Sequence, residues 1–99
     1  MTSVTLSEAK RLMRGWTRAT FGTVARSIRH HFRKHGGGVE ADNVWQYLRK
    51  AYGFRQNLRG AKRKQLPSGK VRYTKSALFL ILDAQGKIVS YGAKNESND

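Results

Sequence analysis

Residues 77–92 read ALFLILDAQGKIVSYG, and this stretch decides the fold of the C-terminal part of the chain. It begins with an unbroken apolar run over residues 77–82, passes through the turn-forming residues 83–86, and ends with residues 87–92, in which the apolar run is shorter. Short apolar runs on either side of a turn are typical of antiparallel β-strands. We therefore expect residues 77–82 and 87–92 to be two strands of one sheet.

The pattern of strand and turn extends back to residue 61. Leu66-Pro67-Ser68-Gly69 is a turn sequence, and it separates residues 61–65 from residues 70–75. The region from about residue 61 to residue 92 therefore predicts an antiparallel meander of about four strands. Residues 93–99 are polar, and we expect them to form a frayed tail.

Residues 5–59 have helical periodicity instead. Thr5-Leu6-Ser7-Glu8 has the spacing of a capping box, which predicts a helix that starts at Leu6 and breaks near Gly15. A second helix is expected to end at Gly36-Gly37-Gly38. Its buried stripe recurs at steps of three or four residues and comprises Phe21, Val24, Ile28, His31, Phe32 and His35. Arg26, Arg29 and Arg33 fall on the other side of this helix.

A third helix is predicted to open at Asp42 or Asn43, with Gln46 at capping-box distance from Asn43. Its expected buried stripe comprises Val44, Tyr47, Leu48, Ala51, Phe54 and Leu58. Helices followed by an antiparallel meander indicate the α+β class, in which the N-terminal helices pack on a twisted sheet of about four strands. We expect residues 1–99 to form a single domain.

The composition indicates a polyanionic partner. Twenty Lys and Arg face six Asp and Glu, so the net charge is +14 in 99 residues. A domain this basic usually meets nucleic acid, an anionic membrane or an acidic protein. The longest apolar run, residues 77–82, is too short to span a bilayer, so we expect no membrane anchor. The chain has no Cys, which excludes disulfides and thiol catalysis.

All three histidines, His30, His31 and His35, lie within six residues. His31 and His35 are neighbours on one helical face, and histidines titrating near neutrality can supply a general base and a general acid. The alternative is a pair of half-buried helix-surface histidines with a structural role. Zinc would need a third ligand beyond these two, and the carboxylates lie at caps, turns or the tail, so we expect no metal and no cofactor.

A basic region covers the first two predicted strands. Its cations are Lys62, Arg63, Lys64, Lys70, Arg72 and Lys75. Strand alternation puts Arg72 and Thr74 on one face and Tyr73 and Lys75 on the other. Arg can clamp a phosphate, Thr can donate to a phosphate oxygen, and Tyr can stack on an unpaired base. The alternative is a solvated edge that prevents aggregation. For Tyr91, a core position and a position lining the site remain equally open.

Together these residues suit a ribonuclease that needs no metal, because the substrate's own 2′-OH is the nucleophile. His31 or His35 would act as general base or acid, Arg72 and Lys34 would stabilise the phosphate, and Thr74 would position it. The remaining candidate RNA-binding residues are Lys62, Lys64, Tyr73, Lys75 and Tyr91. Two alternatives stay open: a non-catalytic RNA- or DNA-binding module, and an interaction domain with an acidic partner.

Residues 27–36, SIRHHFRKHG, resemble the S-I-x-x-H-F-x-K-H-G signature of a toxin domain found at the C-termini of contact-dependent inhibition and Rhs-type polymorphic toxins. Residues 44–51 resemble that family's V-x-x-Y-x-x-K-A helix, and residues 54–60 resemble its F-x-x-N-L-x-G segment. Residues 71–73 and 83–92 resemble its closing I-R-Y and D-x-x-G-K-I-V-S-F-G strands. The resemblance covers about residues 27–92.

The resemblance implies a fold like the barnase/EndoU/colicin/RelE group and metal-independent ribonuclease activity, often on tRNA. It also implies an acidic cognate immunity protein, and delivery within a larger secreted or cell-surface protein that acts in the target-cell cytoplasm. The residues at matched positions are His31, Lys34, His35, Arg72, Tyr73 and Tyr91. The chain departs from the pattern in having Tyr91 where Phe is usual and His30 where Tyr is frequent.

Overall fold

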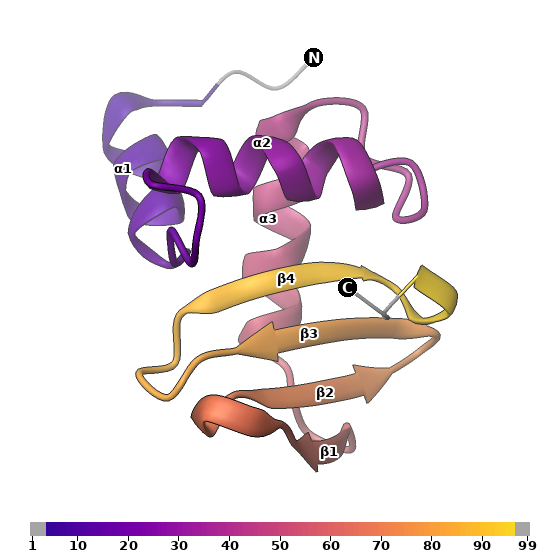
Figure 1. Cartoon of the computed structure of the whole chain (residues 1–99). Helices are drawn as coiled ribbons and strands as arrows, with labels where there is room; N and C mark the ends of the chain where they lie inside the picture. Colours follow the sequence, from indigo (N-terminus) through magenta and orange to yellow (C-terminus); the bar gives the residue numbers. More distant parts are fainter. Residues whose placement is uncertain (1–3, 97–99) are drawn as a thin grey trace.

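The computed structural model describes residues 4–96, in which three helices precede a four-stranded antiparallel sheet (Figure 1). The helices are α1 (Leu6–Arg14), α2 (Val24–His35) and α3 (Val44–Arg55). The strands are β1 (Lys62–Gln65), β2 (Val71–Lys75), β3 (Leu78–Leu82) and β4 (Ile88–Ala93). The predicted α+β class, with N-terminal helices followed by a meander, is confirmed.

Each helix begins at a residue whose side chain accepts a hydrogen bond from a free backbone N–H of the first turn. Thr5 caps α1 and Asn43 caps α3, at the predicted positions. Thr23 caps α2, so this helix starts later than the predicted stripe, and Phe21 lies in the preceding loop. Leu58 was also assigned to a helix stripe, but it lies beyond the end of α3.

The sheet has the order β1-β2-β3-β4, and every neighbouring pair is antiparallel. The register shifts between Ile81 and Leu82: Ile81 pairs with Ser90 and Leu82 pairs with Ile88, which leaves Val89 as the extra residue of a β-bulge. In Figure 1, α3 crosses behind the sheet and α2 runs along its β4 edge. One face of the sheet is therefore covered by α3, and α2 sits over the edge between the two faces.

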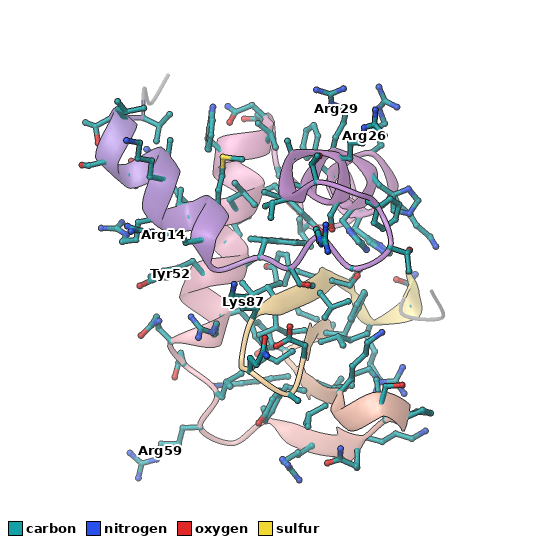
Figure 2. All side chains as sticks on the ribbon, turned by 60° about the vertical axis from the view of Figure 1, so that its left-hand side comes forward. Arg14, Arg26, Arg29, Tyr52, Arg59 and Lys87 are labelled. Carbon is teal, nitrogen blue, oxygen red and sulfur yellow. The ribbon has the colours of Figure 1, made fainter. Side chains whose placement is uncertain are left out.

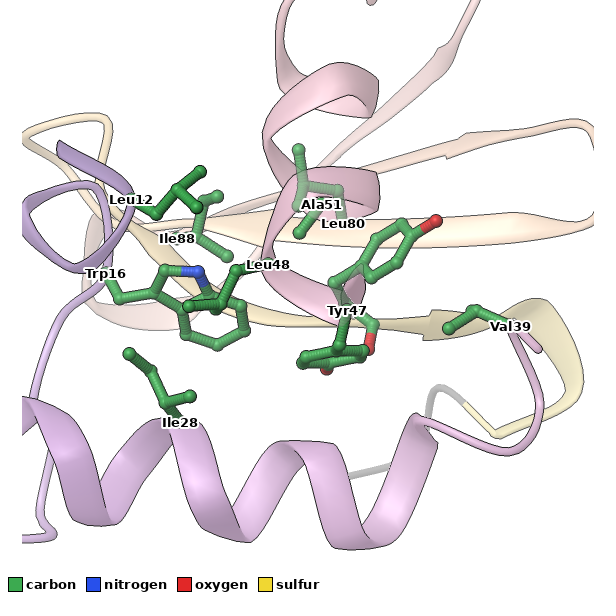
Figure 3. Close-up of a cluster of buried hydrophobic side chains, with 10 residues drawn as sticks. Leu12, Trp16, Ile28, Val39, Tyr47, Leu48, Ala51, Leu80 and Ile88 are labelled. Atoms are coloured by element: carbon green, nitrogen blue, oxygen red, sulfur yellow. The ribbon is translucent and has the colours of Figure 1, made fainter. Parts of the chain in front are cut away.

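The main core lies between the helices and the α3 side of the sheet (Figure 3). Trp16, Tyr47, Leu48, Leu80 and Ile88 are all at most 1% exposed. The backbone at the end of α1 is also tied to β4, because Ile88 N–H donates to the Gly15 carbonyl at 2.6 Å and Thr17 N–H donates to the Ile88 carbonyl at 2.9 Å. These two hydrogen bonds fix the end of α1 to the start of β4.

The sequence predicts a frayed tail over residues 93–99, but its first residues are ordered. β4 includes Ala93, and the backbone N–H of Lys94 donates to the Ala77 carbonyl at 2.7 Å. A short 3₁₀ turn follows at Lys94–Glu96, whereas residues 97–99 lie outside the described part of the chain. No helix within residues 4–96 has the length and apolar character needed to cross a membrane.

Candidate functional site

The face of the sheet opposite α3, here called the open face, carries one row of side chains that crosses all four strands and is polar on β1, β2 and β4. Lys64 pairs with Arg72, Arg72 with Ile81, and Ile81 with Ser90. Directly paired residues point to the same side of a sheet, so these four side chains share the open face. α2 adds His31 beyond Ser90, so a histidine stands at the β4 end of the row.

These residues line one pocket of about 510 Å³. Its lining comprises His31, Lys64, Leu66, Pro67, Ser68, Lys70, Arg72, Ile81, Val89 and Ser90. One wall is the turn between β1 and β2. Within this turn Ser68 has the left-handed backbone conformation, with φ 64°. The Leu66 N–H donates to the Lys70 carbonyl at 2.8 Å and closes this turn. The pocket is therefore bounded by α2 on one side and by the β1–β2 turn on another.

His31 is held in one orientation by its own helix. Its Nδ1 lies 2.8 Å from the backbone carbonyl oxygen of Ser27, one turn earlier. A carbonyl oxygen only accepts hydrogen bonds, so this contact assigns the proton to Nδ1 and leaves Nε2 as the basic nitrogen of the neutral ring. The ring is also packed against Trp16, with the centroids 5.8 Å apart. His31 thus has the orientation and tautomer that a general base requires.

The pocket is strongly cationic. Its lining includes Lys64, Lys70 and Arg72 but no carboxylate. Like charges held together repel one another, and an anion bound between them relieves the repulsion. Lys and Arg are also the side chains that proteins use most for phosphate. The pocket can therefore bind a phosphate group beside a histidine.

A second row on the open face runs beside the first and ends at His35. Lys62 pairs with Thr74, Thr74 with Phe79, and Phe79 with Gly92. The His35 ring has no exposed surface and contacts the edge of Phe79, with the centroids 5.3 Å apart. It also lies nearly parallel to the His31 ring, at a centroid distance of 6.3 Å. His35 is therefore a buried support of His31, outside the pocket lining.

Three predicted binding residues lie on the other face of the sheet. Tyr73 pairs with Leu80, and Leu80 pairs with Tyr91, so this row points toward α3. Tyr91 is 3% exposed and packs against Phe54, and burial raises the pKa of its phenol. Lys75 donates from Nζ to the Asn57 carbonyl at 3.1 Å. The sheet separates Tyr73, Lys75 and Tyr91 from His31, and of the two positions left open for Tyr91, the core position is the one observed.

The other predicted residues occupy the surroundings of the pocket. Lys34 is exposed on α2, one turn after His31, and Lys62 is exposed on β1. Thr74 is half-buried in the second row. His30 is exposed and stacks on Phe21 at a centroid distance of 4.7 Å. Of the predicted site residues, His31, Lys64 and Arg72 are the ones that line the pocket together.

The sequence drew attention to residues 90–92 but gave a candidate role to Tyr91 and none to Ser90, and it did not place the β1–β2 turn in the site. Ser90 could have been found from strand alternation, because it is out of phase with the buried Tyr91. The bulge at Val89 gives no such signal in the sequence. The orienting role of Ser27 follows from its place one helical turn before His31.

Within residues 4–96, no three His, Cys, Asp or Glu side chains are grouped closely enough to hold a metal ion. Comparison of the chain with protein-family models found no match, and a search of curated proteins found none either.

Proposed function

We propose that this domain is a metal-independent endoribonuclease. The observation that supports it most is His31, whose Nδ1 is bonded to the Ser27 carbonyl, in the wall of a pocket that holds three cations and no carboxylate. A base and a cluster of cations around one phosphate are what cleavage by an internal 2′-OH requires. No protein nucleophile is needed, because the substrate supplies its own.

In this mechanism Nε2 of His31 removes the proton of the 2′-OH, and the 2′-oxygen attacks the adjacent phosphorus. Arg72 and Lys64 stabilise the extra negative charge of the phosphorane-like transition state. The bond from phosphorus to the 5′-oxygen then breaks, and this oxygen takes a proton from a cationic donor of the lining, for which Lys70 is the candidate. The products are a 2′,3′-cyclic phosphate and a free 5′-OH. His31 then holds one extra proton and Lys70 lacks one, and exchange with water restores both groups.

The resemblance over residues 27–92 supports a more specific proposal. The substrate is tRNA, and the domain is a toxin carried by a larger secreted or cell-surface protein into the cytoplasm of a target cell. An acidic cognate immunity protein neutralises it. Such a partner suits both the net charge of +14 and the cationic pocket.

The test is incubation of the purified domain with total tRNA in EDTA. We expect cleavage by the wild type, and a rate lower by about 10²–10⁴-fold for His31→Ala, the range for loss of a general base. His30→Ala is the matched control, because His30 is the adjacent histidine but is exposed and outside the pocket. It should cleave at nearly the wild-type rate.

Intact tRNA with the wild type, or equal cleavage by His31→Ala, would contradict the proposal. Binding of tRNA that weakens steeply with salt, without cleavage, would instead favour a non-catalytic RNA-binding module. In that case the bond from His31 to Ser27 would have a structural role alone.

A further inference from the structure

A second hollow lies within the helical layer, between α1, α2 and α3. This helical groove has a volume of about 450 Å³. Its lining comprises Met13, Ala25, Ile28, Arg29, Phe32, Arg33, Val44, Trp45 and Leu48. The α2 residues of the lining recur at steps of three and four, so the groove follows α2 for about two turns, roughly 12 Å. It shares no lining residue with the pocket that contains His31.

The helical groove is apolar in its floor and basic at its rim. Phe32, Val44 and Trp45 are only half-buried, so their apolar surface is accessible. Arg29 and Arg33 are exposed, and neither is paired with a described carboxylate. Figure 2 shows Arg29 projecting outward from α2, next to Arg26. By contrast, Arg49 of α3 pairs with Glu8 of α1 at 2.7 Å and lowers the pKa of that carboxyl.

We propose that the helical groove binds an acidic amphipathic helix of a protein partner. Apolar side chains of that helix fill the floor formed by Phe32 and Trp45, and its carboxylates pair with Arg29 and Arg33. A groove between helices with accessible aromatic and methionine side chains is the usual receptor for such a helix. The charge of the rim selects an acidic partner over a basic one.

RNA fits this groove less well than a helix does. The donors for phosphate, Arg29 and Arg33, lie at the rim, whereas the floor is lined by aliphatic and aromatic side chains, against which a buried phosphate would lose its hydrogen bonds to water. The groove and the pocket lie on different sides of α2, because His31 points to the sheet and Phe32 lines the groove. The partner therefore leaves the pocket open, so binding at the groove and cleavage in the pocket can be measured independently.

The experiment uses two fluorescein-labelled helical peptides of the same Leu, Ala and Glu composition. In one peptide the leucines form a single stripe flanked by glutamates, and in the other they are distributed around the helix. Fluorescence anisotropy is measured near physiological ionic strength, where binding to dispersed surface charge is screened. We expect the amphipathic peptide to bind the wild type at least tenfold more tightly than the scrambled peptide.

The rim variant Arg29→Glu/Arg33→Glu should lose at least tenfold in affinity for the amphipathic peptide. Its matched control is Arg59→Glu/Arg63→Glu, which changes the net charge by the same amount at exposed positions. Figure 2 shows Arg59 at the opposite end of the molecule from Arg29. The control should weaken both peptides alike, by a smaller factor. A peptide with Lys in place of Glu should bind the rim variant more tightly than it binds the wild type. A variant that fails to fold could not show this gain in affinity.

Equal binding of the two peptides would overturn the proposal, as would equal losses in the rim and control variants. A single-stranded RNA oligonucleotide that depends on Arg29 and Arg33 while the peptide does not would assign the groove to nucleic acid instead. Displacement of the amphipathic peptide by RNA bound in the pocket would contradict the separation of the two sites.

Discussion

The two faces of the sheet are built from alternate residues of the same strands, yet they differ in chemistry. On the face toward α3, Tyr73, Leu80 and Tyr91 form a row that ends in the core. On the open face, the adjacent row contains Arg72 and Ser90 and ends at His31. The α3 face packs into the main core, whereas the open face places Lys64 and Arg72 beside a histidine.

A small domain can keep its core and a cluster of cations on opposite faces of one sheet. Neighbouring residues such as Arg72 and Tyr73 are separated by the thickness of the sheet, because side chains alternate along a strand. The three cations that line the pocket, Lys64, Lys70 and Arg72, are exposed or half-buried. Repulsion among them therefore costs less than it would in the core. α2 completes the open face by bringing a histidine over the β4 edge.

Among the variants that compare the two faces, the largest expected effect is on Arg72, and it tests whether the two faces differ in function. Arg72→Ala should lower kcat for tRNA cleavage by about 10²–10³-fold, as removal of a transition-state hydrogen-bond donor does. Arg63→Ala is the control, because Arg63 is exposed on β1 and pairs with Tyr73, on the other face. Its kcat should remain within about twofold of the wild type, with a modest rise in KM from lost charge. Equal losses in the two variants would mean that only the total charge matters.

The second effect concerns the support of the histidines. A Cβ added at Gly92 would lie 2.8 Å from the His35 ring and 2.9 Å from Phe79, so Gly92→Ala must displace both buried rings or shift the strand. We expect the free energy of unfolding to fall by about 1–3 kcal/mol, the usual cost of overpacking, in urea denaturation. Gly53→Ala in α3 is the matched control, since a Cβ there meets nothing within 4 Å. It should raise stability by about 0.5–1 kcal/mol. A neutral Gly92→Ala would show that His35 is not tightly held.

Much of the fold could be predicted because local signals agree with the tertiary structure. The caps at Thr5 and Asn43 and the turn over residues 83–86 each lie where the sequence indicates. The start of α2 could not be predicted in the same way. Phe21 continues the apolar periodicity, but Thr23 accepts a hydrogen bond from Arg26 N–H and fixes the first turn after it.

The site was less predictable than the fold. Spacing alone makes His31 and His35 equivalent, because both lie on one face of α2. What distinguishes them is the long-range packing of Phe79 and Gly92, which encloses His35 completely, whereas His31 is 5% exposed and lines the pocket. Alternation correctly separated Arg72 from Tyr73, but it did not show which of the two faces α2 and the β1–β2 turn would enclose.

The smallest expected effect is on Tyr91, on the α3 face. Burial raises the pKa of its phenol, so the neutral form is favoured in the folded state. The associated stability is complete below the ordinary tyrosine pKa, about 10, and is lost as the pH rises through the raised value. Tyr91→Phe should therefore cleave tRNA normally at neutral pH and lose less stability than the wild type above about pH 10. Phenolate absorbance measures the pKa of the phenol, and urea unfolding measures the free energy of unfolding across the same alkaline range. Loss of tRNA cleavage by Tyr91→Phe at neutral pH would instead place the Tyr91 phenol in the reaction.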